Sequence, residues 1–92
     1  MAIPTPAAVF DLHGLTVLDA TASAERFLRA QRKARPGASV RLITGRGRSG
    51  GGGAPVRTRV RTLLRSLAEQ GTIVRSFELE DSEGSFLVRL AG

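Results

Sequence analysis

The sequence predicts a two-layer α/β fold, in which a four-stranded mixed sheet in βαβαββ order carries both helices on one face. Three observations support this prediction. The chain has 92 residues, enough for one domain with one core. Two segments have apolar residues at helical spacing, and four short segments have the apolar or alternating pattern of strands. Only residues 80–84 separate the last two strand segments, which is short enough for a hairpin turn.

The N-terminal part of the chain predicts a lead-in followed by a strand. Residues 1–8 contain two prolines and little pattern, so we expect them to be disordered or extended, with an α/β domain over 9–92. Residues 9–13 alternate between apolar and polar side chains, as a strand with one buried face does. Since side chains two apart in a strand share a face, Asp11 and His13 are expected on the same side.

The first helix is predicted over residues 17–35. Thr16 is a suitable N-cap, apolar residues then recur at spacings of three and four, and Pro36-Gly37 ends the pattern. Four basic side chains lie away from the apolar face of this helix. They form either a nucleic-acid surface or an ordinary solvated face, and both interpretations stay open for Arg26, Arg29, Arg32 and Lys33.

A glycine-rich loop joins the second predicted strand, residues 40–43, to the second helix. The loop, residues 44–53, contains six glycines, which remove the Cβ atoms that would keep a ligand away from the backbone. The following helix start offers unpaired N–H groups, and Arg46, Arg48 and Arg57 add cations around the same point. We therefore predict a phosphate-binding loop, with a flexible surface loop as the alternative.

Two nucleotide-binding motifs are excluded for this loop. It matches the dinucleotide pattern G-x-G-x-x-G, in which the last glycine already lies at the start of the helix. Here three more glycines and Pro55 follow that position. The acidic residue expected about 20 positions further on would be Glu69, which lies inside a predicted helix instead of at a strand end. A P-loop would end in Gly-Lys-Ser/Thr, which the chain lacks. No nucleotide cofactor is predicted.

The second helix has the clearest amphipathic pattern of the chain. Pro55 lies in the first turn, where a helix tolerates proline, and Gly71 is the natural C-terminal cap. Arg57, Arg61 and Arg65 recur every four residues on a face beside the apolar stripe, so positive charge continues from the loop along the helix. The predicted apolar stripe consists of Val56, Val60, Leu63, Leu64 and Leu67.

Residues 73–79 and 85–90 predict the strands of the hairpin. Glu78 and the connection between these strands hold four of the eight acidic residues of the chain. We therefore expect a polarised molecule, with the acidic hairpin pointing away from any phosphate backbone bound at the basic loop. The sheet face without helices would expose Ile43 or Leu87, as a partner surface, a dimer contact or scattered apolar groups.

Composition restricts the classes of function. The formal net charge is +6, and thirteen of the fourteen basic residues are arginine. This favours phosphate or nucleic acid as the partner, with an arginine-rich codon usage as the alternative explanation. The absence of cysteine excludes a disulfide scaffold and a cysteine zinc site. With no signal peptide and no membrane span, we expect a cytoplasmic protein, as a monomer or as the terminal domain of a larger protein.

The segment Asp11-Leu12-His13-Gly14 is the second candidate site. His13 is the only histidine, shares its predicted face with Asp11, and lies where the first strand ends. Ligands of open α/β sheets bind at the carboxyl ends of the strands. If the first two strands are parallel neighbours, His13 and Arg46 meet at one edge. The alternative is that Asp11 and His13 are ordinary exposed residues before a turn.

Together these segments resemble the Smr domain, the small MutS-related module. The resemblance rests on F-D-L-H-G-L-T at 10–16, I-T-G-R-G at 43–47 and P-V-R at 55–57, and it extends over about residues 9–91. It implies a βαβαββ fold and an endonuclease that nicks or cleaves DNA or RNA. Relatives include recombination-suppressing MutS homologues and ribosome-rescue nucleases, so the resemblance also implies roles in DNA repair and recombination.

The resemblance also implies roles for single residues. Asp11, His13 and Arg46 match positions that it marks as catalytic. Thr44 is a departure, because many relatives have histidine there. Combined with the loop and the basic helix face, the resemblance gives the predicted nucleic-acid or phosphate contacts, which are Gly14, Thr44, Gly45, Gly47, Arg48, Ser49, Arg57 and Arg61.

A mechanism follows as a hypothesis. His13 would act as general base or acid in phosphodiester cleavage, with Asp11 orienting it or holding a metal. Arg46 and the loop amides would stabilise charge on the phosphate oxygens, and Arg57 would hold the neighbouring phosphate. Cleavage of RNA through its 2′-hydroxyl requires no metal, whereas hydrolysis of DNA favours a divalent ion, Mg²⁺ or Mn²⁺. No residue is assigned as a metal ligand.

Two other functions stay open. A non-catalytic nucleic-acid-binding module would use the same basic, glycine-rich edge, and an interaction module would dock through the bare face of the sheet. The chain has no Trp or Tyr and four Phe at core-like positions, so sequence-specific reading of unstacked bases is not expected. We expect recognition of backbone and shape, and the sequence leaves the choice between DNA and RNA open.

Overall fold

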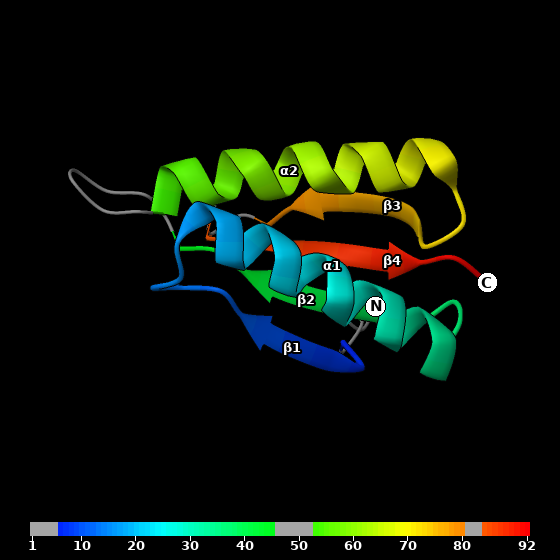
Figure 1. The fold of residues 1–92 in the computed structure, drawn as a ribbon. Helices are drawn as coiled ribbons and strands as arrows, with labels where there is room; N and C mark the ends of the chain where they lie inside the picture. Colours follow the sequence, from blue (N-terminus) through cyan, green and yellow to red (C-terminus); the bar gives the residue numbers. More distant parts are fainter. Residues whose placement is uncertain (1–5, 46–52, 81–83) are drawn as a thin grey trace.

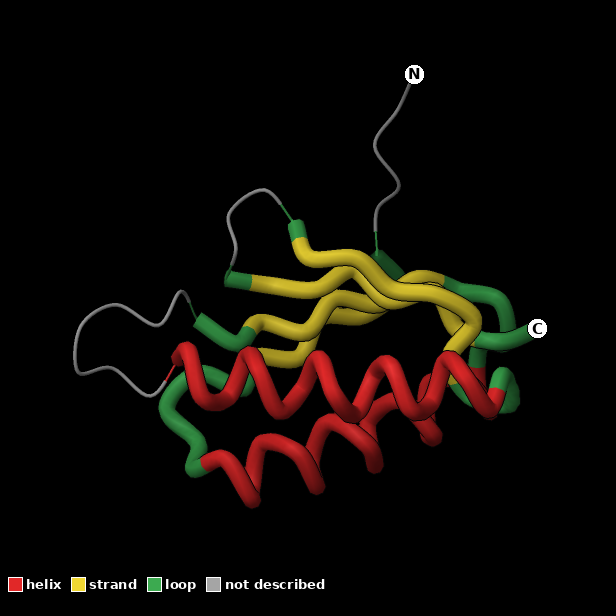
Figure 2. The backbone as a smooth tube through the Cα atoms, turned by 90° about the horizontal axis from the view of Figure 1, so that it is seen from above, coloured by secondary structure: helices red, strands yellow, loops and turns green. Residues whose placement is uncertain are grey.

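Six elements follow one another in the predicted order βαβαββ (Figure 1). The computed structural model describes residues 6–45, 53–80 and 84–92. The elements are β1 Ala8–Asp11, α1 Val17–Ala34, β2 Ser39–Ile43, α2 Gly53–Gln70, β3 Val74–Leu79 and β4 Ser85–Leu90. The sheet order is β1-β2-β4-β3, with β1 parallel to β2 and the other two pairs antiparallel. Both helices cover the same face of this mixed sheet (Figure 2), which confirms the predicted fold class.

The first strand begins and ends earlier than the sequence pattern predicts. β1 starts at Ala8, and the N–H of Ala7 donates a 2.7 Å hydrogen bond to the carbonyl of Ser39, so the last residues before β1 already lie against β2. At the other end β1 stops at Asp11, because the side chain of Asp11 accepts a hydrogen bond from the N–H of His13 and turns the chain. Residues 1–5 lie outside the described residues.

The helix α1 has the predicted start and ends one residue early. The Thr16 side chain accepts a 3.1 Å hydrogen bond from the N–H of Asp19, as an N-cap does. At the C-terminal end the N–H of Arg35 donates to the carbonyl of Gln31, and Gly37 has a φ of +80°, which suits glycine. The residues of α1 that are buried against the sheet are Ala20, Ala24 and Leu28.

The helix α2 begins two residues before Pro55, which therefore lies in the first turn as predicted. Gly71, with a φ of +73°, ends the helix and donates its N–H to the carbonyl of Leu67 at 3.0 Å. The sequence correctly predicts the apolar stripe, although Leu63 is only half-buried. The buried residues of α2 are Val56, Val60, Leu64 and Leu67.

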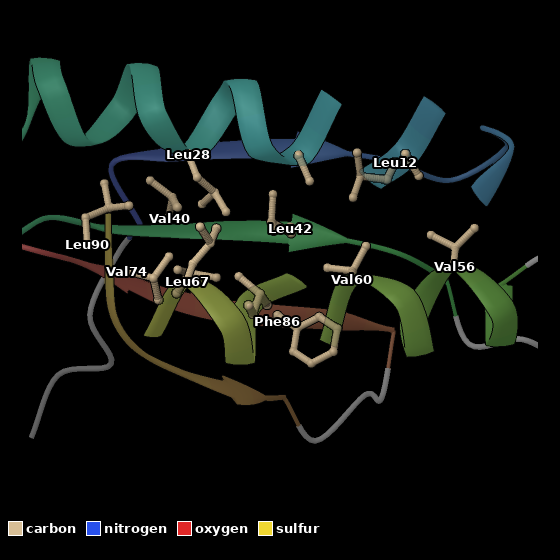
Figure 3. Packing of buried hydrophobic residues seen from close by; sticks show 14 residues of the cluster. Leu12, Leu28, Val40, Leu42, Val56, Val60, Leu67, Val74, Phe86 and Leu90 are labelled. Carbon is tan, nitrogen blue, oxygen red and sulfur yellow. The ribbon is translucent and has the colours of Figure 1, made fainter. Parts of the chain in front are cut away.

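The hydrophobic core lies between the two helices and the sheet, as Figure 3 shows. The aromatic rings pair within this interior: Phe10 and Phe27 have centroids 5.0 Å apart, and Phe77 and Phe86 6.1 Å apart. Burying one large aliphatic side chain contributes roughly 1.5–3 kcal/mol, so the core supplies the main stabilisation of a chain without disulfides. The largest fully buried apolar side chains are Phe86, Leu12, Leu28, Leu42, Leu64, Leu90, Val40, Val60, Val74 and Val88.

The second face of the sheet has no helix over it among the described residues (Figure 2). Ile43 and Leu87 are half-buried there, as expected for outward side chains of the two central strands. Arg41 donates two hydrogen bonds to the carboxylate of Glu80, at 2.8 and 3.0 Å, and the Ser85 hydroxyl donates a third at 2.7 Å. The hydrogen bonds from Arg41 are the main cause that lowers the pKa of Glu80, and they raise the pKa of Arg41.

Candidate functional site

A tight turn follows β1 and presents His13 to solvent. The N–H of Leu15 donates a 3.1 Å hydrogen bond to the carbonyl of Leu12, and Gly14 has a φ of +88°, as the third residue of a type II turn requires. Asp11 accepts the His13 N–H at 2.8 Å. Asp11 and His13 are both exposed, and Gly14 has the conformation that keeps the turn closed. Asp11 therefore fixes the backbone of His13 and makes no hydrogen bond to its ring.

The turn lies beside the start of the glycine-rich loop. Asp11 and Ile43 are paired in the parallel register of β1 and β2, and the N–H of Leu12 donates a 2.7 Å hydrogen bond to the carbonyl of Ile43. The prediction that the first two strands are parallel neighbours is therefore confirmed. It brings His13 to the same edge as Thr44 and Gly45, the first two residues of the loop.

Thr44 is buried, with 1% of its surface exposed. Its hydroxyl donates to the carbonyl oxygens of Gly45 and Gly84, at 3.3 and 3.4 Å. The N–H groups of Thr44 and Gly45 also donate to the Gly84 carbonyl, at 2.8 and 3.0 Å. Thr44 thus anchors the start of the loop to Gly84, the residue before β4, and its side chain does not face solvent as a phosphate contact would. Gly45 has a φ of +87°, which requires glycine at this bend.

The acidic hairpin adjoins the start of the loop, but Asp81 and Glu83 lie outside the described residues, so the expectation that it points away from bound phosphate stays a prediction. The Gly84 carbonyl lies against Thr44 and Gly45, at the same edge as His13. The cause is the strand order: β4 runs antiparallel to β2, so the first residues of β4 adjoin the last residues of β2. The sequence predicted a mixed sheet but not that β4 lies beside β2, and this pairing brings Gly84 next to the loop. The contact of Gly84 with Thr44 and Gly45 was therefore not predicted.

Four structural ends meet at this edge of the domain. The carboxyl ends of β1 and β2 and the N-terminal ends of α1 and α2 all lie at one end of the molecule (Figures 1 and 2). Helix N-termini carry a partial positive charge, and ligands of open α/β sheets bind at strand carboxyl ends. The edge therefore combines both features on which the sequence-based prediction of an anion site depends.

The arginines of α1 and of its C-cap donate hydrogen bonds to protein oxygens, two within the helix and two elsewhere in the chain. Each of the four near or in this helix donates a hydrogen bond to a protein oxygen: Arg26 to Ser23 at 3.3 Å, Arg29 to Glu25 at 2.8 Å, Arg32 to the Gly92 carbonyl at 3.1 Å and Arg35 to the Ala7 carbonyl at 2.7 Å. Two of these bonds tie α1 to the chain ends. Arg32 therefore has a structural contact, whereas Lys33 is exposed without a partner among the described residues, and both interpretations of the basic face stay open.

The arginines of α2 differ from those of α1. Arg59, Arg61 and Arg65 are exposed, and none of them has a hydrogen bond or ion pair with a residue that the structure describes. Arg57 is half-buried near the start of the helix. Sequence reasoning selected Arg57 and Arg61 and missed Arg59, which lies between them on a different side of the helix.

Several predicted contacts lie outside the described residues, namely Arg46, Gly47, Arg48 and Ser49. Within 6–45, 53–80 and 84–92 there is no group of three His, Cys, Asp or Glu side chains that could hold a metal ion. Asp11 and His13 alone provide two candidate ligands. No helix in the described part of the chain is both long and apolar enough to cross a membrane.

Comparison with known proteins agrees with this architecture. The family model of the Smr domain matches residues 10–91, from β1 to the end of β4. Neither the search of curated proteins nor the search of solved structures gives a match. Smr domains are a family of nuclease-related nucleic-acid-binding modules. Because the match spans nearly the whole chain and includes the His13 turn and the glycine-rich loop, the chain belongs to the Smr domain family.

Proposed function

We propose that this Smr domain is an endonuclease that cleaves phosphodiester bonds of nucleic acid at the edge formed by the His13 turn and the glycine-rich loop. One observation carries the proposal. The chain's only histidine is exposed on a hydrogen-bonded turn. The N–H of the preceding residue, Leu12, donates a hydrogen bond to the carbonyl of Ile43, which is the last residue before the loop. A proton-transfer group is thus held beside a loop whose composition suits phosphate.

The chemistry assigned to this edge is proton transfer and charge stabilisation. An imidazole can accept or donate a proton, so His13 is assigned as the general base that activates a nucleophile or as the acid that protonates the leaving oxygen. Asp11 contributes by fixing the backbone of His13. Arg46 and the loop amides are proposed to stabilise the charge that develops on the phosphate, and Arg57 to hold the adjacent phosphate.

Mg²⁺ or Mn²⁺ would polarise the phosphate and lower the pKa of a bound water. Asp11 and His13 are the side chains at this edge that would hold such an ion, but the described residues include no group of three ligands. The proposal therefore assigns no step to a metal. RNA cleavage through the 2′-hydroxyl and DNA hydrolysis both remain compatible with the proposed role of His13.

The test compares wild type with His13→Ala on supercoiled plasmid, branched DNA and RNA, with Mg²⁺, Mn²⁺ or EDTA. Loss of cleavage with nucleic-acid affinity within about three-fold of wild type is expected, because His13 is assigned chemistry and not phosphate binding. The matched control is Gln70→Ala, an exposed polar residue at the opposite end of α2, which should cleave as wild type does. Cleavage by the His13→Ala protein at the wild-type rate would refute the catalytic role of His13, whereas absence of cleavage by the wild type would refute the nuclease proposal itself.

A second candidate function is a nucleic-acid-binding module without catalysis. The observation that favours it is the contact of Asp11, which goes to the backbone of His13 and leaves the imidazole without a hydrogen-bond partner among the described residues. A wild-type protein that binds nucleic acid but cleaves none of the three substrates under any of the metal conditions would select this function.

A further inference from the structure

We propose that the exposed face of α2 lies in the major groove of a B-form DNA duplex, so that the bound nucleic acid carries a duplex DNA arm. The α2 face consists of Thr58, Arg59, Arg61, Thr62, Arg65 and Ser66, all of which are exposed. This inference rests on the proposed function, in which nucleic acid binds at the edge formed by the His13 turn and the glycine-rich loop. Its test, however, measures binding and requires no cleavage.

The α2 face carries more unpaired positive charge than the exposed face of α1. Between Gly53 and Ala68 the helix contains no acidic residue, and the first one, Glu69, lies in the last turn. Arg59, Arg61 and Arg65 have no hydrogen-bond or ion-pair partner among the residues that the structure places. The α1 arginines, in contrast, are occupied by protein oxygens. Of the exposed basic side chains of the two helices that have no partner among the described residues, three lie on α2, namely Arg59, Arg61 and Arg65, and one, Lys33, lies on α1.

The arginines flank the α2 face on both sides. Arg59 lines a hollow between the two helices together with Leu18 and Thr21 of α1, so it lies on the side of α2 toward α1. Successive helical residues are about 100° apart, which places Arg61 and Arg65 on the opposite flank. The four-residue interval between Arg61 and Arg65 corresponds to about 6 Å of helix, close to two 3.4 Å steps along one strand of DNA.

Short hydroxyl side chains lie between Arg59 and the flank of Arg61 and Arg65, and two of them, Thr62 and Ser66, line the same hollow as Arg59. Thr58, Thr62 and Ser66 recur every four residues, and the Thr62 hydroxyl donates to the Thr58 carbonyl, which keeps it close to the helix. A helix face with only short side chains at its centre can approach the floor of a groove while the flanking arginines reach the two phosphate backbones. The major groove of B-form DNA admits an α-helix, whereas the major groove of A-form RNA is too deep and narrow.

Single-stranded nucleic acid is a poorer fit, because binding of single strands uses exposed aromatic rings on which bases stack. The chain has no Trp or Tyr. Its phenylalanines form two pairs, Phe10 with Phe27 and Phe77 with Phe86, and none of the four is exposed. Contacts to phosphates are therefore the main source of affinity, which favours a regular duplex over unstacked bases.

The test uses a triple variant of the α2 face, Arg59→Gln, Arg61→Gln and Arg65→Gln, with glutamine chosen to preserve helix propensity. The matched control removes the same charge from α1, by Arg26→Gln, Arg29→Gln and Lys33→Gln. Fluorescence anisotropy measures the affinity of each protein for a fluorescein-labelled DNA duplex, its single strand and the corresponding RNA duplex over a series of salt concentrations. Circular dichroism verifies that each variant is folded.

The α2 variant is expected to bind duplex DNA at least about ten-fold more weakly than wild type at low salt. Its salt slope should fall by about three, roughly one for each phosphate contact removed. The α1 control should stay within about three-fold of wild type, and wild type should prefer duplex DNA to the other two ligands. Equal losses in the two triple variants, or wild-type preference for single strands or duplex RNA, would overturn the inference. This result is independent of whether His13 supports cleavage.

Discussion

The backbone N–H of Leu12 donates a 2.7 Å hydrogen bond to the carbonyl oxygen of Ile43. The bond extends the pairing of β1 and β2 beyond Asp11, the last paired residue of β1, and holds the His13 turn beside the glycine-rich loop. Leu12 is fully buried, so this connection is anchored in the core. Exposed side chains of the turn are therefore open to substitution without separating the two segments, which makes their individual roles measurable.

The side chain of Asp11 provides the first prediction. Since its observed contact is a hydrogen bond accepted from the His13 N–H, Asp11→Asn should keep the turn, because an amide oxygen accepts the same bond. Asp11→Ala should lose about 1 kcal/mol of unfolding free energy, and cleavage should fall much further than in Asp11→Asn. Urea unfolding and plasmid nicking provide the measurements. Equal inactivation of both variants with unchanged stability would indicate that the carboxylate charge itself acts.

The conformation of Gly14 provides the second prediction. Gly14 has a φ of +88°, and a Cβ built there would meet no atom within 4 Å, so the cost of Gly14→Ala is conformational and not steric. We expect a loss of about 1–2 kcal/mol. For a domain of this size, that loss lowers the melting temperature by roughly 4–16 °C. Gly14→Asn should recover part of it, because asparagine tolerates positive φ. Melting at the wild-type temperature in Gly14→Ala would contradict the turn geometry.

Local signals in the sequence predict the elements well because the physics behind them is local. The N-cap of α1 at Thr16 and the C-terminal glycine of α2 at Gly71 each depend on residues within four positions. The apolar stripe of α2 is also predicted locally, because the spacing of its apolar residues within the helix shows which face is buried. These features fix the fold class before any long-range contact is known.

The site is harder to predict because its contacts join distant parts of the chain. The position of Gly84 beside Thr44 follows from the pairing of β4 with β2, which no local pattern specifies. The contacts of the arginines also depend on distant parts of the chain. Arg35 donates a hydrogen bond to the carbonyl of Ala7, whereas Arg61 has no partner among the described residues. Charge pattern alone therefore predicted the basic character of both helices but not which of their arginines donate hydrogen bonds to protein oxygens.

The third prediction concerns Glu80 and acid stability. The hydrogen bonds from Arg41 lower the pKa of Glu80 in the folded state, so ionised Glu80 stabilises the fold above the pKa of an unfolded glutamate, about 4.3. This contribution is lost as pH falls through the lowered pKa. Glu80→Gln should cost about 0.5–1 kcal/mol at neutral pH and nothing near pH 2.

Urea unfolding of wild type and Glu80→Gln across this pH range measures the difference. The matched control is Glu69→Gln, at an exposed position of α2 without a partner among the described residues, where the free energy of unfolding should change little at any pH. A Glu80→Gln penalty that stays constant from neutral to acid pH would show that ionisation of Glu80 is not the source of its contribution.

The last prediction compares two leucines of α1, which share the helix and the propensity cost of substitution. Leu28 is fully buried in the core, whereas Leu18 is 79% exposed. Leu28→Ala should lose about 2–5 kcal/mol, since it removes buried apolar surface and leaves a cavity, and this is a large share of the roughly 5–15 kcal/mol that stabilises such a domain. Leu18→Ala should change stability by less than about 0.5 kcal/mol. Chemical denaturation of both proteins measures the contrast, and a substantial loss in Leu18→Ala would mean that this side chain packs against another part of the protein in solution.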